Sequence, residues 1–510
     1  MSASKFDYDK FRLRNFVEKL IAAGEVEVHD EPVPLSDVAG RLNGNSKAVL
    51  FRKAGPEGAQ LVGGVLGSRR RAALAFGVEN EREVFRELLR RLERPQPVIE
   101  VPSSEAPVHQ EILTGEDADF TRLPIHVQHE FDGGPYISAG IDCSRNNETG
   151  LTNIGFRRLM LRGRRHAGTN LYAPSDLREY YRACVARGER MPCSFVVGSH
   201  PVDHLAAMQR LAGDELALMG ALRGEPLPVV RCKSNDLLVP ADAEYVFEGY
   251  FDERGYAEPE GPYGEFMGYY GEMKPNPVFH LTAITRRRDA LFQTTTISGD
   301  VARTEAAIIG AIDCEAFSWR TALTAIREPV AVHAVSASNG NHNLRLALRQ
   351  RSPGDARNAI TALLSSHSNV KHVFVVDPDI DVYSDEQMDW ALSTRFQADR
   401  DLIVLAGMRG NPIDPSMDFG RGLAKAGFDL TVPFGQLGSR KFTRGEPPRI
   451  AAQRTHGSVR EALEAGPKSF VALMRALGSQ DGREIVLELD KLRSEGVLAR
   501  LELGEYTLNK

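Results

Sequence analysis

The sequence predicts a mixed α/β (α+β) protein made of several domains. With 510 residues the chain is too long for one hydrophobic core, because such cores rarely grow beyond about 250–300 residues. Helix-like and strand-like apolar runs alternate up to about residue 95 and again from about residue 316, whereas the middle holds many short strand-like runs between turn signals. We therefore expect two α/β regions separated by a β-rich region.

The composition is that of an ordinary globular protein. Apolar residues make up 42% and charged residues 26% of the chain, and the net charge of −6 indicates neither a nucleic acid nor a membrane as a partner. No apolar run reaches the roughly 18 residues of a bilayer span, and the charged N-terminus does not resemble a signal peptide. The five cysteines lack CxxC spacing, which predicts free thiols and a cytoplasmic location.

Residues 1–115 are predicted to form an N-terminal α/β domain. The stretch FRLRNFVEKLIAAG has apolar residues at helical spacing and a glycine stop at Gly24, and the strand-like EVEVHDEPV follows it. The Pro- and Ser-rich stretch ERPQPVIEVPSSEAPVHQE supplies the boundary to the next region.

Residues 116–315 form the predicted β-rich region. Its strands are exemplified by YISAGIDCS, LTNIGFRRLML and VFHLTAITRR, and such short strands at close spacing favour a barrel or a sandwich. Helices are expected to interrupt them at SDLREYYRACVARG and HLAAMQRLAGDELALMGALRG.

Two regions complete the chain. In residues 316–454, the runs VAVHAVSAS, HVFVVDPDIDVY and DLIVLAG are typical of buried parallel strands. In residues 455–510, two helices and the hairpin ARLELGEYTL resemble part of a winged helix. Residues 467–510 carry seven Lys or Arg and seven Asp or Glu, and because a DNA-reading module should be basic, we favour packing or contact with a partner over DNA binding.

The most unusual stretch is EPEGPYGEFMGYYGEM, residues 258–273. It places Glu260 and Glu265 five positions apart, with glycines and a proline between them that exclude a continuous helix. Two neighbouring carboxylates tend to divide into one charged and one neutral group, which suits general acid–base chemistry. Taken alone, the stretch is also typical of an ordinary surface turn.

Arg158 and Glu215 are the other candidates for chemistry. Arg158, in NIGFRR, is either a surface residue in a salt bridge or a buried anchor that holds a carboxylate with two hydrogen bonds. Asp214 and Glu215 begin an apolar helix, where acids favour the helix dipole, although Glu215 together with an asparagine oxygen would also suit Mg²⁺ or Mn²⁺. No phosphate-binding loop or zinc-ligand spacing is present.

Several stretches together resemble one family, the UbiD family of prenylated-FMN-dependent decarboxylases. In chain order they are GGPYISAG with NIGFRRLML, GALRGEPLPVVRCKSNDLLVPADAEYVFEG, PEGPYGEFMGYY, VKHVFVVDPDIDVYSDEQMDWALSTRFQADRD and GLAKAGFDLT. The resemblance runs from the N-terminal helix to about residue 450, and the tail lies outside it.

The resemblance implies an N-terminal α/β domain, a central split β-barrel that holds the flavin, and a C-terminal α/β domain that assembles dimers or hexamers. It implies reversible, non-oxidative decarboxylation of aromatic, heteroaromatic or α,β-unsaturated acids, with the cofactor carrying the hard chemistry. A flavin prenyltransferase would supply the cofactor. The same site would also support the reverse reaction, carboxylation.

By position, Arg158, Glu260 and Glu265 match the family's catalytic triad, in which the arginine holds the carboxylate and the second glutamate gives the proton. The positions that match the family's flavin-contacting residues are Asn153, Ile154, Phe156, Arg157, Arg158, Glu215 and Lys371. The positions that match its ligands for a divalent ion, Mn or Mg, are Asn153, Asp176 and Glu215. A potassium ion is also implied.

Asp176 is a departure from the family pattern, because a histidine commonly stands at this position. An aspartate is a hard oxygen ligand for Mn²⁺ or Mg²⁺, but it adds negative charge beside the flavin phosphate. This departure and the tail leave an alternative open: a non-catalytic flavin-binding or assembly subunit of a carboxylase complex. The stretches QTTTISGD, residues 293–300, and 267–270 are expected to line the substrate pocket, whose preferred acid stays open.

Overall fold

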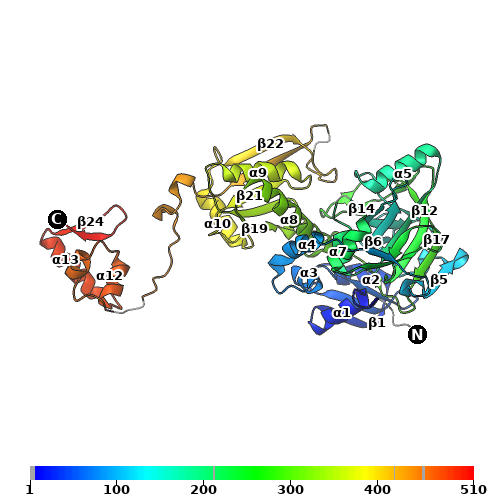
Figure 1. Ribbon diagram of the computed structural model, residues 1–510, viewed down its shortest axis with the longest axis horizontal. Coiled ribbons are helices and arrows are strands. Elements are labelled where there is room, and N and C mark those ends of the chain that lie inside the picture. Colours follow the sequence, from blue (N-terminus) through cyan, green and yellow to red (C-terminus); the bar gives the residue numbers. More distant parts are fainter. Residues whose placement is uncertain (1–5, 211–212, 418–419, 451–453, 510) are drawn as a thin grey trace. The chain divides into compact units, whose positions relative to one another are not determined.

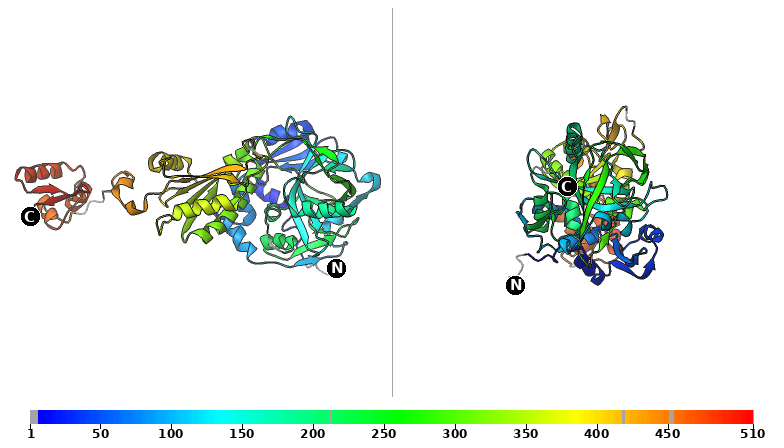
Figure 2. Two further views of the ribbon diagram at one scale, coloured as in Figure 1. Left: turned by 90° about the horizontal axis from the view of Figure 1, so that it is seen from above. Right: turned by 90° about the vertical axis from the view of Figure 1, so that its right-hand side faces the viewer.

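A computed structural model gives the structure of residues 6–210, 213–417, 420–450 and 454–509. The chain divides into two compact units, residues 1–431 and 432–510. The larger unit contains the barrel and both α/β regions, as Figures 1 and 2 show. Among the described residues, no helix has both the length and the apolar character needed to cross a bilayer.

The N-terminal sheet has the order β1-β2-β3-β18. Its strands are β1 (Val26–Val33), β2 (Ala48–Ala54), β3 (Ala59–Gly63) and β18 (Phe292–Gln293). Helix α1 (Leu13–Ala22) ends just before Gly24, whose φ of +73° is left-handed, so the predicted helix and its glycine stop are confirmed. Strand β18 lies more than 200 residues after β3 in the sequence but pairs with it. The segment that follows β18, residues 294–299, therefore lies next to the N-terminal region.

The central β-rich region is a closed barrel, which decides between the two predicted architectures. Six strands close in the order β12-β9-β6-β7-β8-β17, because β17 also pairs with β12. The strands are β6 (Tyr136–Arg145), β7 (Thr152–Leu161), β8 (His166–Gly168), β9 (Met191–Val197), β12 (Tyr245–Phe251) and β17 (Val278–Arg286). Phe195, Phe251 and Phe279 meet edge to face in the core. Strand β5 (Glu111–Thr114) extends the sheet beside β17.

Helices cover the barrel where the sequence predicted interruptions. These helices are α5 (Asp176–Arg187), α6 (Pro201–Ala206) and α7 (Glu215–Arg223). A small sheet of order β11-β10-β4 lies beside them, formed by β4 (Val98–Glu100), β10 (Leu227–Arg231) and β11 (Leu238–Pro240). Helices α3 (Arg69–Phe76) and α4 (Val84–Leu92) pack against one another, and α4 also contacts α7.

The second α/β region contains a five-stranded sheet of order β19-β20-β21-β23-β22. The strands are β19 (Pro329–Ala334), β20 (Asn343–Leu348), β21 (His372–Val376), β22 (Leu402–Met408) and β23 (Leu423–Asp429). The three central strands β20, β21 and β23 are parallel. Of the three runs predicted to be parallel strands, only β21 is one. The prediction was wrong for β19 and β22, which are antiparallel edge strands. The helices are α8 (Glu305–Ala325), α9 (Asp355–Ser366) and α10 (Asp385–Arg395), and α8 contacts both the sheet and α4 (Figure 1).

The C-terminal unit holds the predicted winged-helix-like tail. Its elements are α11 (Val459–Glu464), α12 (Phe470–Leu477), α13 (Arg483–Ser494), β24 (Leu498–Arg500) and β25 (Tyr506–Leu508). Leu473, Ile485 and Leu489 belong to its separate core. Helix α11 was not expected from the sequence. The domain boundaries at residues 115, 315 and 454 stay a prediction.

Candidate active site

The Gly- and Pro-rich stretch 258–273, called the acid loop below, forms two short ribbons together with the residues 274–276 that follow it. Strands β13 (Glu258–Glu260) and β16 (Lys274–Asn276) form one, and β14 (Tyr263–Gly264) and β15 (Tyr270–Gly271) form the other. The stretch excludes a helix as predicted, but it is more regular than the irregular loop expected. Gly261 has a φ of +93°, which favours glycine, and its peptide bond to Pro262 is cis.

Two glutamates of the acid loop, Glu260 and Glu265, meet Arg158 on β7. Arg158 donates from Nε to Glu260 Oε1 at 2.9 Å and from Nη2 to Glu260 Oε2 at 3.2 Å. It also donates from Nη1 to Glu265 Oε1 at 2.7 Å. The strand and the loop are about one hundred residues apart in sequence, so the barrel creates this cluster. The Arg158 side chain is 15% exposed, so it is not a surface residue. Its role as an anchor for a substrate carboxylate stays a prediction.

Aromatic and amide groups complete the surroundings of the cluster. The Arg158 guanidinium lies 4.3 Å from the centre of the Tyr263 ring, a cation–π contact. Tyr136 donates its hydroxyl to Glu260 at 3.1 Å, and the Asn276 amide approaches the same carboxylate at 3.4 Å. Burial opposes the charge on Arg158, but the two glutamates outweigh it and raise the pKa of Arg158 above its ordinary value. Arg158 therefore stays a cation that can bind a carboxylate.

Glu215 and Asn153 lie together at the start of β7. Glu215 is 8% exposed and accepts from the Ile154 amide at 2.7 Å, and Asn153 is 7% exposed. Burial raises the pKa of Glu215 to about 7, and the Asp176 carboxylate adds to the shift. A cation beside Glu215 would stabilise its charged form and offset the effect of burial. Carboxylate and amide oxygens are hard ligands, so Glu215 and Asn153 fit a divalent ion. Within the described ranges, no three His, Cys, Asp or Glu side chains gather in a metal-binding group.

The remaining flavin-binding candidates occupy two regions. On β7, the Phe156 ring meets His204 edge to face at 5.2 Å, and Arg157 donates from Nε to Asp142 at 3.2 Å. Lys371, just before β21, donates to Asp414 at 2.8 Å and to Ser416 at 2.6 Å. The structure thus brings the β7 candidates together with Glu215 and places Lys371 in the second α/β region.

A cleft of about 870 Å³ lies between the barrel region and the second α/β region. Met208 and Arg210 line it from one side, and Asn369, Asn411 and Lys425 from the other. Its size is in the range of cofactor sites. Sequence reasoning missed these residues, because they come from separate segments and carry no local motif.

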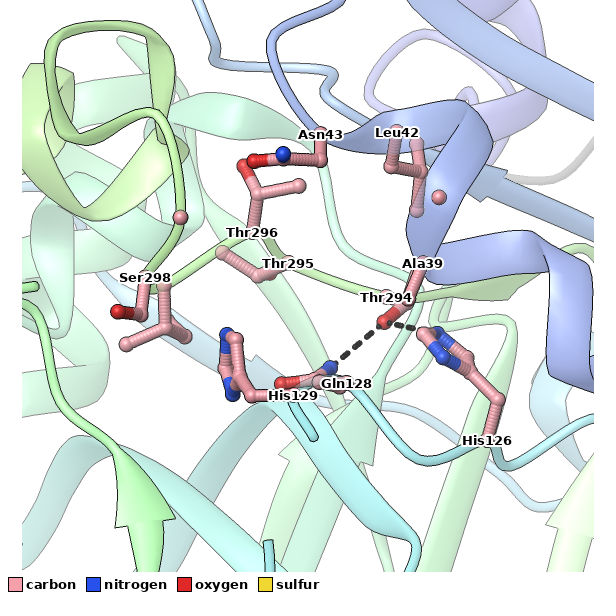
Figure 3. A pocket seen from close by; sticks show the side chains of 13 residues that line it. Ala39, Leu42, Asn43, His126, Gln128, His129, Thr294, Thr295, Thr296 and Ser298 are labelled. Atoms are coloured by element: carbon pink, nitrogen blue, oxygen red, sulfur yellow. Dashed lines mark hydrogen bonds between the residues drawn. The ribbon is translucent and has the colours of Figure 1, made fainter. Parts of the chain in front are cut away.

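A second pocket, of about 240 Å³, lies beside the acid loop (Figure 3). In Figure 3, Gln128 and His129 lie across the open centre from Thr295 and Thr296. The predicted substrate stretch supplies residues 294–299 of the lining, whereas His126, Gln128 and His129 were not singled out. Ile297 packs against the small apolar cluster of Tyr136, Met160 and Tyr263, so the pocket adjoins the residues around Arg158.

The neighbours of Thr294 show how the wall is connected. Thr294 Oγ1 lies 3.1 Å from His126 Nε2 and accepts from Gln128 Nε2, also at 3.1 Å. Gln128 Oε1 in turn accepts from the Tyr263 hydroxyl at 2.5 Å. One hydrogen-bonded chain therefore leads from the pocket to the ring that covers Arg158.

Comparison with known proteins identifies the class to which this fold and site belong. Residues 17–92, 99–300 and 307–430 match the family models described as the N-terminal, Rift-related and C-terminal domains of 3-octaprenyl-4-hydroxybenzoate carboxy-lyase, UbiD. These ranges cover more than half of the chain. The barrel between two α/β regions is thus the UbiD architecture.

Named relatives agree with this class. Anhydromevalonate phosphate decarboxylase from Methanosarcina mazei is 30% identical over 82% of this chain and 95% of its own. The UbiD-class enzyme HmfF from Pelotomaculum thermopropionicum, in complex with FMN, has a TM-score of 0.80 and 32% identity, covering 86% of this chain and 97% of its own. An evolved dimeric form of HmfF in complex with prFMN has a TM-score of 0.77, 30% identity and the same coverage.

A structure of an aromatic acid decarboxylase is also similar. Apo 3,4-dihydroxybenzoic acid decarboxylase (AroY) from Klebsiella pneumoniae has a TM-score of 0.77 and 26% identity, covering 86% of this chain and 98% of its own. The chain belongs to the UbiD family, and it is a carboxy-lyase of that family.

Proposed function

We propose that this chain uses prenylated FMN to remove the carboxylate of an aromatic, heteroaromatic or α,β-unsaturated acid as CO2, reversibly and without oxidation. The observation that carries the proposal is Arg158, with a side chain only 15% exposed, bridging Glu260 and Glu265. The complexes of HmfF with FMN and with prFMN support a flavin in this chain as well. When bound, prenylated FMN supplies the electron sink that C–C cleavage requires.

Arg158 is proposed to bind the substrate carboxylate. Glu260 accepts two hydrogen bonds from Arg158 and so fixes the plane of the guanidinium. The third nitrogen, Nη1, donates to Glu265. A guanidinium held in this way presents a rigid fork that matches a carboxylate. Tyr263 stacked on its face excludes water from one side.

Glu265 is proposed as the proton donor. Loss of CO2 leaves an electron pair on the substrate carbon, and a proton must reach that carbon to complete the product. Glu265 is 8% exposed and bonds Arg158 through one oxygen, so its carboxyl group is sheltered but not fully engaged. The reverse path removes the same proton, which gives the carboxylase direction.

Asn153, Glu215 and Asp176 are proposed to hold a divalent ion, Mn or Mg, with a potassium ion beside the flavin phosphate. Buried Glu215 and Asn153 support this assignment, and Asp176 supplies a carboxylate near Glu215. Ile154, Phe156, Arg157 and Lys371 are proposed to contact the flavin.

The 240 Å³ pocket is proposed to receive the part of the acid remote from its carboxylate. Thr295 is 2% exposed, and its hydroxyl finds no hydrogen-bond partner among the described residues. The lining contains hydroxyl, amide and imidazole groups, and no Lys or Arg among the residues described there. This lining favours an uncharged polar substituent, such as a hydroxyl, over the phosphate in the name of the Methanosarcina mazei relative.

The proposed setting is a cytoplasmic homo-oligomer. All five cysteines are free and buried, which suits a reducing compartment. Val404 on the edge strand β22 is 59% exposed, as an interface residue would be in an isolated chain. Light scattering of the purified protein measures the oligomer directly.

The test is to co-express the chain with a flavin prenyltransferase, identify the released cofactor by mass spectrometry, and screen aromatic and acrylic acids for CO2 release. Prenylated FMN together with turnover of a hydroxylated aromatic acid is the expected result. Prenylated FMN without turnover of any acid favours the non-catalytic subunit. Plain FMN or no flavin contradicts the proposal and makes Asp176 the first residue to exchange.

A further inference from the structure

Residues 128–133, QHEFDG, lie against the acid loop, and Asp132 joins the two segments. Asp132 Oδ1 accepts from the Gly264 amide at 2.9 Å, one residue before Glu265. Asp132 Oδ2 accepts from the His129 amide at 2.9 Å, and His129 Nδ1 lies 3.1 Å from the same oxygen. The Asp132 side chain is fully buried. One carboxylate therefore ties an imidazole to the backbone beside the proposed proton donor.

The His129 ring occupies the place where a side chain at position 264 would lie. A Cβ on Gly264 would be 2.4 Å from His129 Nδ1, which is too close for any real contact. The ring also meets Tyr263 edge to face at 5.5 Å. Glycine at position 264 thus lets the ring support the backbone directly.

The same segment holds a second point of the acid loop. The Gly133 amide donates to the Pro262 carbonyl at 2.8 Å, and a Cβ on Gly133 would be 2.2 Å from the Gly261 carbonyl oxygen. Positions 262 and 264 are therefore both fixed from outside the loop, immediately before Glu265. Both contacts need a glycine where the backbones approach.

We propose that Asp132 and His129 form a positioning pair that sets the location of the Glu265 carboxyl group. The pair acts through the Gly264 backbone and does not itself transfer a proton. The inference rests on the proposed role of Glu265, because a general acid must lie within hydrogen-bond reach of one defined carbon. Supporting groups of this kind are what keep a catalytic side chain in productive geometry.

Asp132→Ala tests the pair, because it removes the acceptor of the Gly264 amide. In the protein without cofactor, amide hydrogen exchange over residues 261–270 is expected to become at least about tenfold faster. In the enzyme loaded with cofactor, kcat is expected to fall about 10²-fold with KM little changed. A displacement of the Glu265 carboxyl group by about 1 Å is enough to lower the rate by this factor. Asp132→Asn keeps an acceptor oxygen and is expected to recover most of kcat.

Asp119→Ala is the matched control. Asp119 is also buried and accepts a backbone amide, that of Thr121, at 2.9 Å. Within the described part of the chain, its side-chain hydrogen bonds go to Thr121 and Arg164 and not to the acid loop. It is expected to leave exchange in the loop and kcat unchanged. Gly264→Ala disturbs the same contact from the side of the acid loop. It should speed amide exchange in the loop and lower kcat as Asp132→Ala does, and it provides the test if Asp132→Ala folds poorly.

Unchanged exchange in the loop and unchanged kcat in Asp132→Ala overturn the inference, and so does an Asp132→Asn variant as defective as Asp132→Ala. The proposed function is judged separately. If the wild-type enzyme loaded with prenylated FMN turns over no acid, that function fails, while the exchange measurement still decides whether the pair holds the loop.

Discussion

Arg158 and Arg223 each bridge two carboxylates, but only Arg158 is proposed to do chemistry. Arg158 joins Glu260 and Glu265 of the acid loop. Arg223, at the end of α7, joins Asp203 at 2.7 Å and Asp242 at 2.6 Å. In both cases burial opposes the arginine charge, and the neighbouring acids raise the arginine pKa above its ordinary value.

The two clusters differ in how completely they are closed. Arg223 makes two hydrogen bonds to each aspartate, and all three side chains are at most 3% exposed. Asp203 lies on a helix, and Phe11 covers the guanidinium at 5.2 Å. Arg158 instead gives Glu265 a single hydrogen bond, and Glu265 directly follows β14, in the connection between β14 and β15.

The difference teaches that a buried arginine with two acids does not by itself define an active site. In a closed cluster such as that of Arg223, each charged group is paired with another group of the protein, and the cluster serves to fix the packing. An open cluster leaves one carboxyl group and part of the guanidinium available to a ligand. The predictions below separate the two, beginning with the largest effect on the reaction.

Glu265→Gln is expected to lower CO2 release about 10³-fold, because it removes the proton donor and keeps the size of the side chain. Flavin absorbance of the purified variant should match that of the wild type. Retention of more than about a tenth of the wild-type rate would contradict the role assigned to Glu265.

Arg158→Lys is expected to lower kcat/KM about 10²-fold, with much of the change in KM. Lysine keeps the charge but loses the planar fork that bonds Glu260 and the substrate together. Steady-state kinetics over a range of acid concentrations provides the measurement. A KM equal to that of the wild type would show that the arginine does not bind the carboxylate.

Asp176→Asn is expected to weaken Mn²⁺ binding to the flavin-loaded protein about tenfold, measured by titration calorimetry after removal of metal with a chelator. Glu179→Gln, on the exposed face of the same helix, is the control and should bind Mn²⁺ as the wild type does. Equal affinities in all three proteins would remove Asp176 from the ligand set.

Arg223→Met is expected to have the smallest effect on the reaction. It leaves two buried carboxylates without a partner, which costs about 3–5 kcal/mol of unfolding free energy. Denaturant titration should show this loss, while kcat per folded molecule stays at the wild-type value. A large fall in kcat without loss of stability would mean that this cluster is also part of the reaction centre.

Much of the fold was predictable because its signals are local. Helix α1 and its stop at Gly24, and the last two helices and hairpin of the tail, follow from spacing and turn residues within single segments. The antiparallel direction of β19 and β22 was not predictable, because an apolar run does not reveal its pairing partner. Helix α11 is only six residues long and carries a weak pattern.

The candidate site was predictable only in part. The residue types of Arg158, Glu260 and Glu265 stood out, and their order resembled a family. The role of Asp132 and His129 was hidden, because their contact with Gly264 joins segments more than 130 residues apart and leaves no periodic signal. The GG after Asp132 was the one available clue, since paired glycines indicate a close approach of backbones.

Solvent deuterium incorporation tests the central claim most directly. The wild-type enzyme loaded with prenylated FMN would be incubated in D2O with the product of the best acid from the screen, beside the Glu265→Gln variant with equal flavin content. The account predicts deuterium at the carbon that carried the carboxylate in the wild type, and nearly none in the variant. Equal incorporation by both proteins, or none by a wild-type enzyme that releases CO2, would contradict it.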